Sequence, residues 1–382
     1  VVARVRAADE RQMVEHLSGE LARRHRLVRA QGIHRLDSQR LSRYRFRHIL
    51  FQRYLYNSLD QVDRAHLHEA VGNTLEVLCE AQTGALAEHA GQLAWHFQEA
   101  GIPAKAIDYL CQAGDRAVRL SANEEAIAHF DQALELLGTL PDAGRAREEL
   151  DLQLDLAAPL QATRGYAAPE VGRSYARARE LCQQVEETPH LIPVLWLLTS
   201  FYGVRAEYRT ANEIGEQLLS LAQRTEDPLL VALAHWSLGW PLVHLGELTS
   251  ALDHHKQMID FYDLQQHRDL SFLYGQDPGV SSLSWSAWAL WLLGYPDQAL
   301  KRSREALALA QELDHPFTLC FALCIGGVLV RQFRREAQAA QEQSLELMRL
   351  SLENGFVLYE AEGTICLGWA LSDEGQVEEG IA

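Results

Sequence analysis

Lysine is almost absent from this chain of 382 residues, which contains only Lys105, Lys256 and Lys301. None of them follows a glycine, so the Gly-x-x-x-x-Gly-Lys-Ser/Thr motif that holds nucleotide phosphates is missing. Proline is also scarce, at 11 residues, and no long stretch alternates between apolar and polar residues, which argues against a large sheet. No Ser/His/Asp or Cys/His arrangement stands out either, so we expect no catalytic residue and no nucleotide cofactor in this chain.

Cysteine is too thinly spread for a disulfide framework or a zinc site. Cys320 and Cys324 are one helical turn apart, but no second Cys or His pair lies near them in sequence, and tetrahedral zinc needs four ligands. We expect buried thiols and no disulfides among all six cysteines, which are Cys79, Cys111, Cys182, Cys320, Cys324 and Cys366.

One local group of histidines and aspartates could suggest a metal: His244, His254 and His255 with Asp253 and Asp260. Adjacent residues on a helix point about 100° apart, so these side chains cannot all converge. We therefore expect a solvated or packed helix face and no metal.

Long hydrophobic runs are missing as well. The longest uncharged stretches, 278–296 and 316–330, are interrupted by Ser, Gly or Pro or are too short to cross about 30 Å of hydrocarbon. We expect no membrane segment, no signal peptide and a cytoplasmic location. Because the chain opens at Val1 without a methionine and ends within an apparent repeat, we also expect it to be part of a longer protein.

Charge divides the chain into two parts. Residues 1–56 carry 13 Arg against five acidic residues, a net of +8, whereas the whole chain carries −17, which leaves −25 for the other 326 residues. This asymmetry predicts a basic front module and an acidic second module.

The second module contains a repeated template. A small residue at position zero is followed by a bulky or apolar residue at +3, a Gly at +7 and an Ala or Gly at +12. The four full copies are Ala94-Phe97-Gly101-Ala106, Gly239-Leu242-Gly246-Ala251, Ala287-Leu290-Gly294-Ala299 and Gly368-Leu371-Gly375-Gly380. Three weaker copies lack the Gly at +7: Gly114-Ala117-Ala126, Thr199-Tyr202-Ala211 and Gly327-Val330-Ala339.

This template predicts antiparallel helix pairs with a period near 40 residues. Small residues at zero and +12 let two helix backbones approach, and the Gly at +7 ends the first helix in the left-handed conformation. Between the +12 positions at 126 and 211 we expect one degenerate repeat, with helices near 146–162 and 168–185 and with Pro141 and Pro169 marking its edges. A turn-rich loop is expected at 275–279. The fold class predicted is all-α, a tetratricopeptide-like α-solenoid preceded by a small winged-helix-like module.

The front module reads as a helix over 9–25 and two strands over 27–36 and 42–46 around a turn at 37–40. Helices are expected over 48–59 and 63–79. We divide the chain into a winged-helix-like module at 1–56, linking helices at 57–83 and the repeat array at 84–382. An Arg-rich winged helix could bind DNA, but the absence of Lys and the scatter of Arg over helix and hairpin favour an adjoining protein domain.

Tryptophans are the candidate ligand-binding residues of the array. Trp196, Trp236 and Trp285 fall in first helices of repeats, and Trp288 lies three residues after Trp285. First helices line the concave surface of such solenoids, where aromatic side chains anchor peptides. The alternative is that these rings are core between helices.

Several segments resemble one family. Tyr44-Arg45-Phe46-Arg47-His48, Ala113 to Ala117, Ser121 to Ala126, Gly275 to Val280, Leu292 to Leu300 and Gly368 to Leu371 are similar to the region after the ATPase module in bacterial STAND-class signalling ATPases. Many of these are fused to class III adenylate or guanylate cyclase domains, or to kinase or transcription-factor domains. The resemblance implies a winged-helix remnant and sensor repeats without the ATPase and output domains.

The resemblance also suggests a role for His48. In related STAND proteins a His at the end of the winged helix contacts the phosphates of bound ADP, and His48 occupies a similar place; the alternative is a packing residue at a strand end. We thus expect a non-enzymatic sensor that binds a protein or peptide on its repeats and contacts a nucleotide-binding domain of the same protein. The alternative is a transcriptional regulator whose basic front module binds DNA and whose repeats bind an effector.

Overall fold

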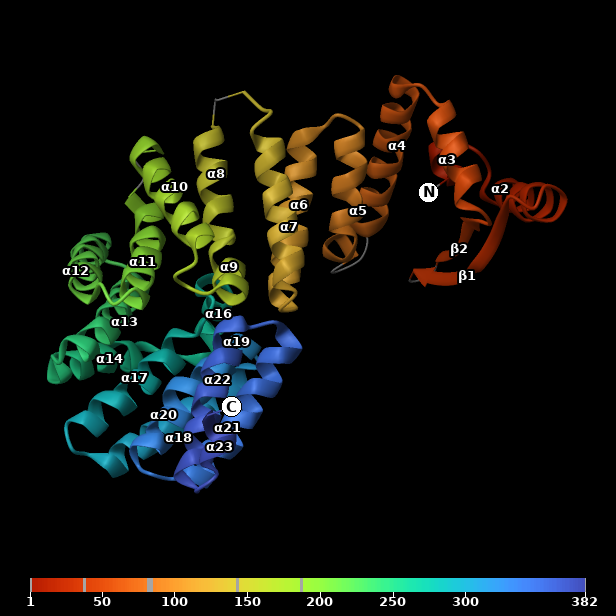
Figure 1. Ribbon diagram of the computed structural model, residues 1–382. Coiled ribbons are helices and arrows are strands. Elements are labelled where there is room, and N and C mark those ends of the chain that lie inside the picture. The colour runs from red at the N-terminus through yellow and green to blue at the C-terminus, as the bar shows by residue number, and fades with distance from the viewer. Residues whose placement is uncertain (1, 37–38, 81–84, 142–143, 186–187, 382) are drawn as a thin grey trace. The chain divides into compact units, whose positions relative to one another are not determined.

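The computed structural model describes residues 2–36, 39–80, 85–141, 144–185 and 188–381. They divide into two compact units, the first holding Val1–Ala113 with Glu135–Leu140 and the second Gly114–Leu134 with Pro141–Ala382. Figure 1 shows the helices and the hairpin of these units.

The first unit begins with short helices and a β-hairpin. α1 (Val2–Val5) and α2 (Glu10–Glu15) precede a π-helical segment, η1 (His16–Arg24), and then come the antiparallel strands β1 (Val28–Leu36) and β2 (Gln39–Phe46). The predicted helix over 9–25 and both predicted strands are confirmed, although β2 begins at Gln39 rather than Ser42. The predicted turn includes Asp37 and Ser38, which lie outside the described residues.

Helices complete the first unit. α3 (Ile49–Ser58) and α4 (Gln61–Glu80) confirm the helices predicted over 48–59 and 63–79, and α5 (Ala85–Glu99) and the start of α6 (Pro103–Arg119) follow. α5 and α6 meet through the stacked rings of Phe97 and Tyr109, 5.7 Å apart. Gly72 of α4 lies under the Phe97 ring, where a Cβ would come within 3.2 Å. A small residue therefore lets α4 and α5 pack closely.

In the second unit all the described secondary structure is helical. Its helices are α7 (Asn123–Leu137), α8 (Arg145–Asp155), α9 (Ala157–Arg164), α10 (Pro169–Val185), α11 (Thr188–Val204), α12 (Tyr208–Thr225), α13 (Pro228–Leu245), α14 (Leu248–Phe261), α15 (Leu264–His267), α16 (Leu270–Tyr274), α17 (Pro278–Leu292), α18 (Pro296–Leu313), α19 (Pro316–Phe321), η2 (Ala322–Val328), α20 (Leu329–Phe333), α21 (Ala337–Asn354), α22 (Val357–Asp373) and α23 (Val377–Ile381). α12 packs on α13, α13 on α14, α17 on α18 and α21 on α22, which makes a tetratricopeptide-like solenoid of helix pairs (Figure 1).

The +7 position of the template turns the chain between paired helices. Its glycines all take the left-handed conformation, as predicted, with φ of 73°, 82°, 87° and 91° at Gly101, Gly246, Gly294 and Gly375. In two weaker copies the same position is held by Ser121 and Ala206, whose φ values are 56° and 62°. The turn therefore forms even where the sequence offers no glycine, at a cost in backbone energy.

The register predicted for the copy near residue 330 is wrong by one residue. The left-handed residue there is Arg335, with φ of 59°, and the fully buried alanine is Ala340, whereas Ala339 is only partly buried. Position zero is therefore Val328 rather than Gly327. The sequence offered two adjacent glycines as the small residue, and the local π-helical turns of η2 alter the spacing that an α-helix would keep.

The close approach predicted for positions zero and +12 is present. A Cβ on Gly368 of α22 would lie 2.5 Å from the carbonyl oxygen of Gly380 in α23, so only glycine fits. In three other copies the +12 residue is an alanine with no exposed surface, at Ala106, Ala251 and Ala299. The +12 position is thus a packing position.

The expected degenerate repeat is found as α8, α9 and α10. The first predicted helix, 146–162, is broken at Leu156 into α8 and α9, and the second, predicted over 168–185, is found as α10 over Pro169–Val185.

The loop predicted at 275–279 is shorter than expected, because Pro278 and Gly279 already belong to α17, and it is buried. Asp277 has no exposed surface and caps α17: its Oδ1 accepts from the Val280 amide at 2.8 Å, and its Oδ2 accepts from the Tyr262 hydroxyl at 2.6 Å. The Asp277 amide donates to Thr318 Oγ1 at 3.0 Å. Burial raises the pKa of Asp277 to about 6 although both hydrogen bonds favour the carboxylate. The loop is therefore held between α14, α17 and α19.

Two helical segments have the length and hydropathy of membrane spans, Pro228–Leu245 and Pro316–Phe333. More than half of each lies buried within the chain, as expected for core helices of a repeat array. Their hydropathy is explained by burial between neighbouring helices.

Candidate functional site

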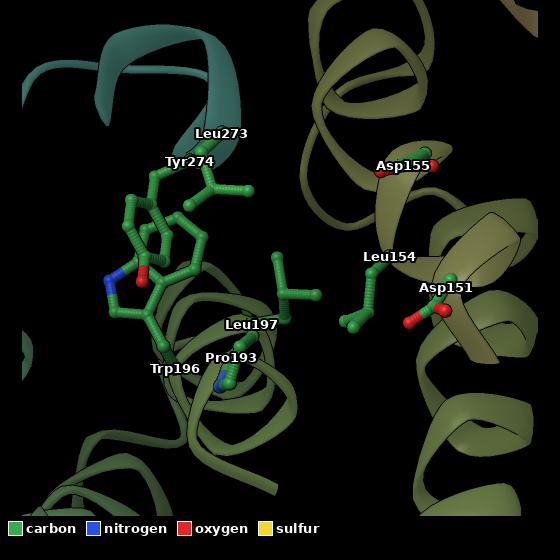
Figure 2. A pocket seen from close by; sticks show the side chains of 8 residues that line it. All are labelled: Asp151, Leu154, Asp155, Pro193, Trp196, Leu197, Leu273 and Tyr274. Atoms are coloured by element: carbon green, nitrogen blue, oxygen red, sulfur yellow. The ribbon is translucent and has the colours of Figure 1, made fainter. Parts of the chain in front are cut away.

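A pocket of about 230 Å³ opens between α8, α11 and α16 in the second unit. Its lining residues are Asp151, Leu154, Asp155, Pro193, Trp196, Leu197, Leu273 and Tyr274. Figure 2 shows Trp196 and Tyr274 on one side and the two aspartates on the other, with Leu154 and Leu197 pointing toward each other between them. The pocket therefore has an aromatic wall and an acidic wall.

The aromatic wall is rigidly supported. The rings of Trp196 and Tyr274 meet edge to face at 4.7 Å, and Trp196 stacks on Trp236 at 4.8 Å. Trp236 is fully buried, and its indole N–H donates to Ser281 Oγ at 2.9 Å. Trp196 is thus held by a partner ring that is itself fixed by a hydrogen bond.

The acidic wall comes from the last two turns of α8. Asp151 is exposed and Asp155 is partly buried, one helical turn further along. Burial, followed by the nearby carboxylates of Asp115 and Asp151, raises the pKa of Asp155 to about 7. The carboxylates of Asp115 and Asp151 therefore disfavour the charged form of Asp155.

The four tryptophans predicted to bind ligand lie in two groups. Trp196 lines the pocket, with Trp236 directly behind it. Trp285 and Trp288 meet edge to face at 5.1 Å in a second cluster, which also contains Trp240, stacked on Trp285 at 6.0 Å. Trp285 is buried and Trp288 is partly buried.

The sequence did not predict most of the residues that line the pocket. Asp151, Asp155 and Tyr274 belong to elements that are far apart along the chain. The one available signal was the predicted loop at 275–279, because Tyr274 immediately precedes it. The sequence did not show that this loop turns inward.

The three histidines considered for metal binding contact different neighbours. His244 stacks on Tyr208 at 4.5 Å, and His254 Nδ1 lies 2.8 Å from His235 Nδ1. His255 is fully buried against Gly239, and burial lowers its pKa to about 3. Among the described residues no three His, Cys, Asp or Glu side chains are arranged to hold a metal ion.

The two neighbouring cysteines are buried thiols. Cys320 Sγ lies 3.8 Å from Ser351 Oγ, and Cys324 Sγ donates to Glu362 Oε2 at 3.2 Å. Burial raises the pKa of Cys320 to about 12 and that of Cys324 well above its ordinary value. None of the six cysteines forms a disulfide, as predicted. Five of them are buried, but Cys111 is only partly buried, so the expectation of a buried thiol is wrong there.

His48 lies at the junction of the hairpin and α3 in the first unit. It is exposed and caps α3, because its Nδ1 accepts from the Leu50 amide at 3.3 Å. Its ring contacts Phe51 edge to face at 6.2 Å. Large side chains of α3 are also exposed, each by 45% or more, namely Ile49, Leu50, Phe51, Tyr54 and Leu55.

Comparison with known proteins shows the fold and little more. No protein-family model matches the chain. An uncharacterized protein of Rhizobium meliloti (strain 1021) is 24% identical over 341 residues, which cover 86% of this chain and 32% of that protein. The chain therefore spans about a third of the length of this relative.

Solved structures of repeat proteins are among those that are similar to this chain. A Rap protein complexed with Competence and Sporulation Factor has a TM-score of 0.54 at 12% identity, covering 72% of this chain and 74% of that one. A STAND protein with a tetratricopeptide repeat sensor from Pyrococcus horikoshii has a TM-score of 0.42 at 13% identity, covering 91% of this chain and 55% of that one. The likeness to the Rap protein shows a shared helical-repeat fold.

Proposed function

We propose that this chain is the non-enzymatic sensor of a multidomain signalling ATPase, in which the repeat array binds a protein or peptide partner in the cytoplasm. The pocket with one aromatic and one acidic wall carries this proposal. Repeat solenoids bind partners on extended surfaces, and apolar pockets with a few polar groups are where ligands bind. Trp288, which is partly buried, contacts the partner at the second cluster, and Trp196, which is 3% exposed, forms part of the pocket wall beneath it. Trp236 and Trp285 support these two rings.

The first unit supplies the contact with the rest of the protein. The exposed apolar side chains of α3 form a surface that water solvates poorly, and such patches mark interaction sites. We propose that a nucleotide-binding domain of the same protein covers α3 and that His48 faces its bound ADP. In this proposal residues 1–56 form a winged-helix-like module, 57–83 link it to the array and 84–382 form the sensor.

Nucleotide exchange in the full-length protein tests this arrangement. His48→Ala should speed ADP release, because a contact that favours the resting state is lost, and a tenfold shift between states corresponds to about 1.4 kcal/mol. His66→Ala, at an exposed histidine of α4, is the matched control and should leave release unchanged. Equal rates of ADP release in wild type and His48→Ala would mean that His48 serves only as a helix cap.

Removal of the array tests regulation separately. A full-length protein that lacks residues 84–382 should differ from wild type in its basal ATPase rate, because the sensor biases the balance of states. The same rate with and without the array would contradict a regulatory role.

A second candidate function is DNA binding by the hairpin. Arg29 of β1 pairs across the sheet with Arg45 of β2, and both side chains are exposed. Arg43 lies two residues before Arg45 on the same face of β2, and Arg47 follows just after the strand. Like charges directly opposite each other are unfavourable, so this basic face favours an anionic partner. Salt-dependent anisotropy titration with duplex DNA, comparing wild type with Arg45→Ala, would separate the two functions.

A further inference from the structure

We propose that Tyr56 is a positioning residue: its hydroxyl fixes α3 on α4 and α5 and thereby determines where His48 points. This inference rests on the proposed contact between α3 and a nucleotide-binding domain, and it adds what keeps that contact in one geometry. It is carried by the exposure of α3, by the hydrogen bonds of the Tyr56 hydroxyl and by the place of their partners in the fold.

α3 has very little buried surface to hold it in place. No residue of this ten-residue helix is buried, and Tyr56 is the one that is partly buried. A helix of this length is marginally stable in water by itself. The residues that flank it, His48 and Leu59, are extended, with ψ of 130° and 138°, so α3 is not continuous with α4. Its orientation therefore depends on side-chain contacts.

The Tyr56 hydroxyl joins α3 to both α4 and α5. It donates to Oε2 of Glu99 in α5 at 3.1 Å and lies 3.0 Å from Nε2 of His68 in α4. The His68 ring meets the Tyr56 ring edge to face at 5.8 Å, and the Arg64 guanidinium lies 5.4 Å from the centre of the Tyr56 ring. One side chain of α3 therefore contacts both helices.

These hydrogen bonds form a chain with a fixed direction. The single proton of the Tyr56 hydroxyl goes to the Glu99 carboxylate, so Nε2 of His68 must carry the proton that lies between His68 and Tyr56. Burial lowers the pKa of both His68 and His96, that of His96 to about 4, so both rings are neutral near pH 7. Nδ1 of His68 then accepts from Nδ1 of His96 at 3.0 Å. Loss of the hydroxyl would leave the buried His68 N–H without an acceptor.

The partners of Tyr56 lie where the repeats begin. Glu99 and His96 belong to α5, which contains the start of the first template copy. A displacement of α5 relative to α4 would change the hydrogen bonds of Tyr56 to both helices at once. Since Tyr56 and His48 lie near opposite ends of one helix, a change at Tyr56 reorients His48. The hydrogen bonds of Tyr56 therefore give the first repeat a route to His48.

Hydrogen–deuterium exchange of the 382-residue chain tests the attachment of α3. Tyr56→Phe removes only the hydroxyl, and the amides of α3 should then exchange at least about tenfold faster than in wild type, because a helix that is held less firmly opens more often. The amides of α6 should exchange as in wild type, which shows that the rest of the unit is folded. Tyr54→Phe is the matched control in the same helix, because Tyr54 is 73% exposed, and it should leave exchange from α3 unchanged.

ADP release by the full-length protein tests the positioning of His48. Tyr56→Phe should release ADP faster than wild type, because His48 is no longer held in one place. If Tyr56 acts through His48, the double variant Tyr56→Phe/His48→Ala should release ADP no faster than His48→Ala alone, since two changes that remove the same contact do not add. Tyr295→Phe, at an exposed tyrosine in the turn before α18, is the control and should leave release unchanged.

Two results would overturn the inference. Equal exchange from α3 in Tyr56→Phe and wild type would mean that the hydroxyl does not hold α3. Additive effects in the double variant would mean that Tyr56 influences ADP release without positioning His48. A failure of the proposed function looks different, because ADP release would then be the same in wild type and His48→Ala while exchange from α3 would still be faster in Tyr56→Phe.

Discussion

The indole N–H of Trp288 donates to the main-chain carbonyl of Ile325 at 3.0 Å. Ile325 lies in the π-helical segment η2, where hydrogen bonds reach one residue further than in an α-helix. The bond therefore links α17 to the π-helical segment η2. Trp288 is also 5.5 Å from Phe333, so its ring and its N–H are both used in packing.

Replacement of Trp288 tests the importance of this bond. Trp288→Phe keeps an aromatic ring but leaves the Ile325 carbonyl without its indole donor, and we expect a loss of about 1–2 kcal/mol in the free energy of unfolding. Trp291→Phe is the control, because Trp291 stacks on Phe333 at 5.9 Å and the new ring can still stack. Urea unfolding measures both. Equal losses would mean that the ring and not the N–H stabilises this region.

The left-handed turns predict opposite effects of two substitutions. Ala206→Gly should stabilise the chain by about 0.5–1 kcal/mol, because Ala206 adopts φ of 62° at the cost of a close Cβ contact. Gly246→Ala should destabilise it by about 1 kcal/mol, and the cause would be conformational, because nothing lies within 4 Å of the added Cβ. Differential scanning calorimetry should show the two melting temperatures on opposite sides of wild type.

Asp277 should contribute more to stability than an ordinary helix cap. Asp277→Ala removes the acceptor for Val280 and leaves the Tyr262 hydroxyl unpaired, so we expect a loss of about 2–4 kcal/mol. Asp277→Asn should cost less, because its amide can accept from Val280 and donate to Tyr262. Urea unfolding of both variants tests this order. Similar losses in both would show that the charge itself is required.

Local backbone chemistry explains what the sequence could predict. Gly246 and Gly294 mark turns because the left-handed conformation favours glycine, and this preference needs no knowledge of the rest of the fold. The register at Val328 could not be predicted in the same way, because the π-helical turns of η2 follow from packing against α17 and α21.

The pocket could not be predicted either, because its residues come from segments that are far apart in the sequence. Asp155 and Tyr274 line the same pocket although their helices, α8 and α16, are separated by more than 100 residues of sequence. The raised pKa of Asp155 depends on burial, which no local pattern of residues specifies. Only the position of Trp196 within a first helix follows from the repeat alone.

The chain should not bind ATP with micromolar affinity. It lacks the P-loop motif, and each lysine is engaged: Lys105 with Glu76 at 2.7 Å, Lys301 with Glu305 at 3.9 Å, and Lys256 with Asp260. Calorimetric titration with Mg-ATP should therefore show no binding in this range. The full-length protein is the positive control, and micromolar binding by this chain alone would overturn the prediction.

Asp155 should make the stability of the chain depend on pH. Its pKa is raised to about 7 in the folded chain, whereas an unfolded aspartate has a pKa of about 3.9. Between these values the folded chain binds a proton that the unfolded chain does not, so this group's contribution to stability falls as pH rises from 4 to 7. Above pH 7 the charged carboxylate remains beside Asp115 and Asp151 and destabilises the fold.

Asp155→Asn removes this effect, because an amide stays neutral. The variant should be more stable than wild type at pH 8, by about 1–2 kcal/mol after allowance for solvent screening, and the advantage should disappear near pH 4. Urea unfolding at pH 4, 6 and 8 measures the difference, and subtraction of the wild-type curve cancels the contributions of the other groups that titrate. Asp253→Asn, whose carboxylate is exposed, should show no such trend. An Asp155→Asn advantage that is the same at all three pH values would mean that the Asp155 carboxyl titrates normally in the folded chain.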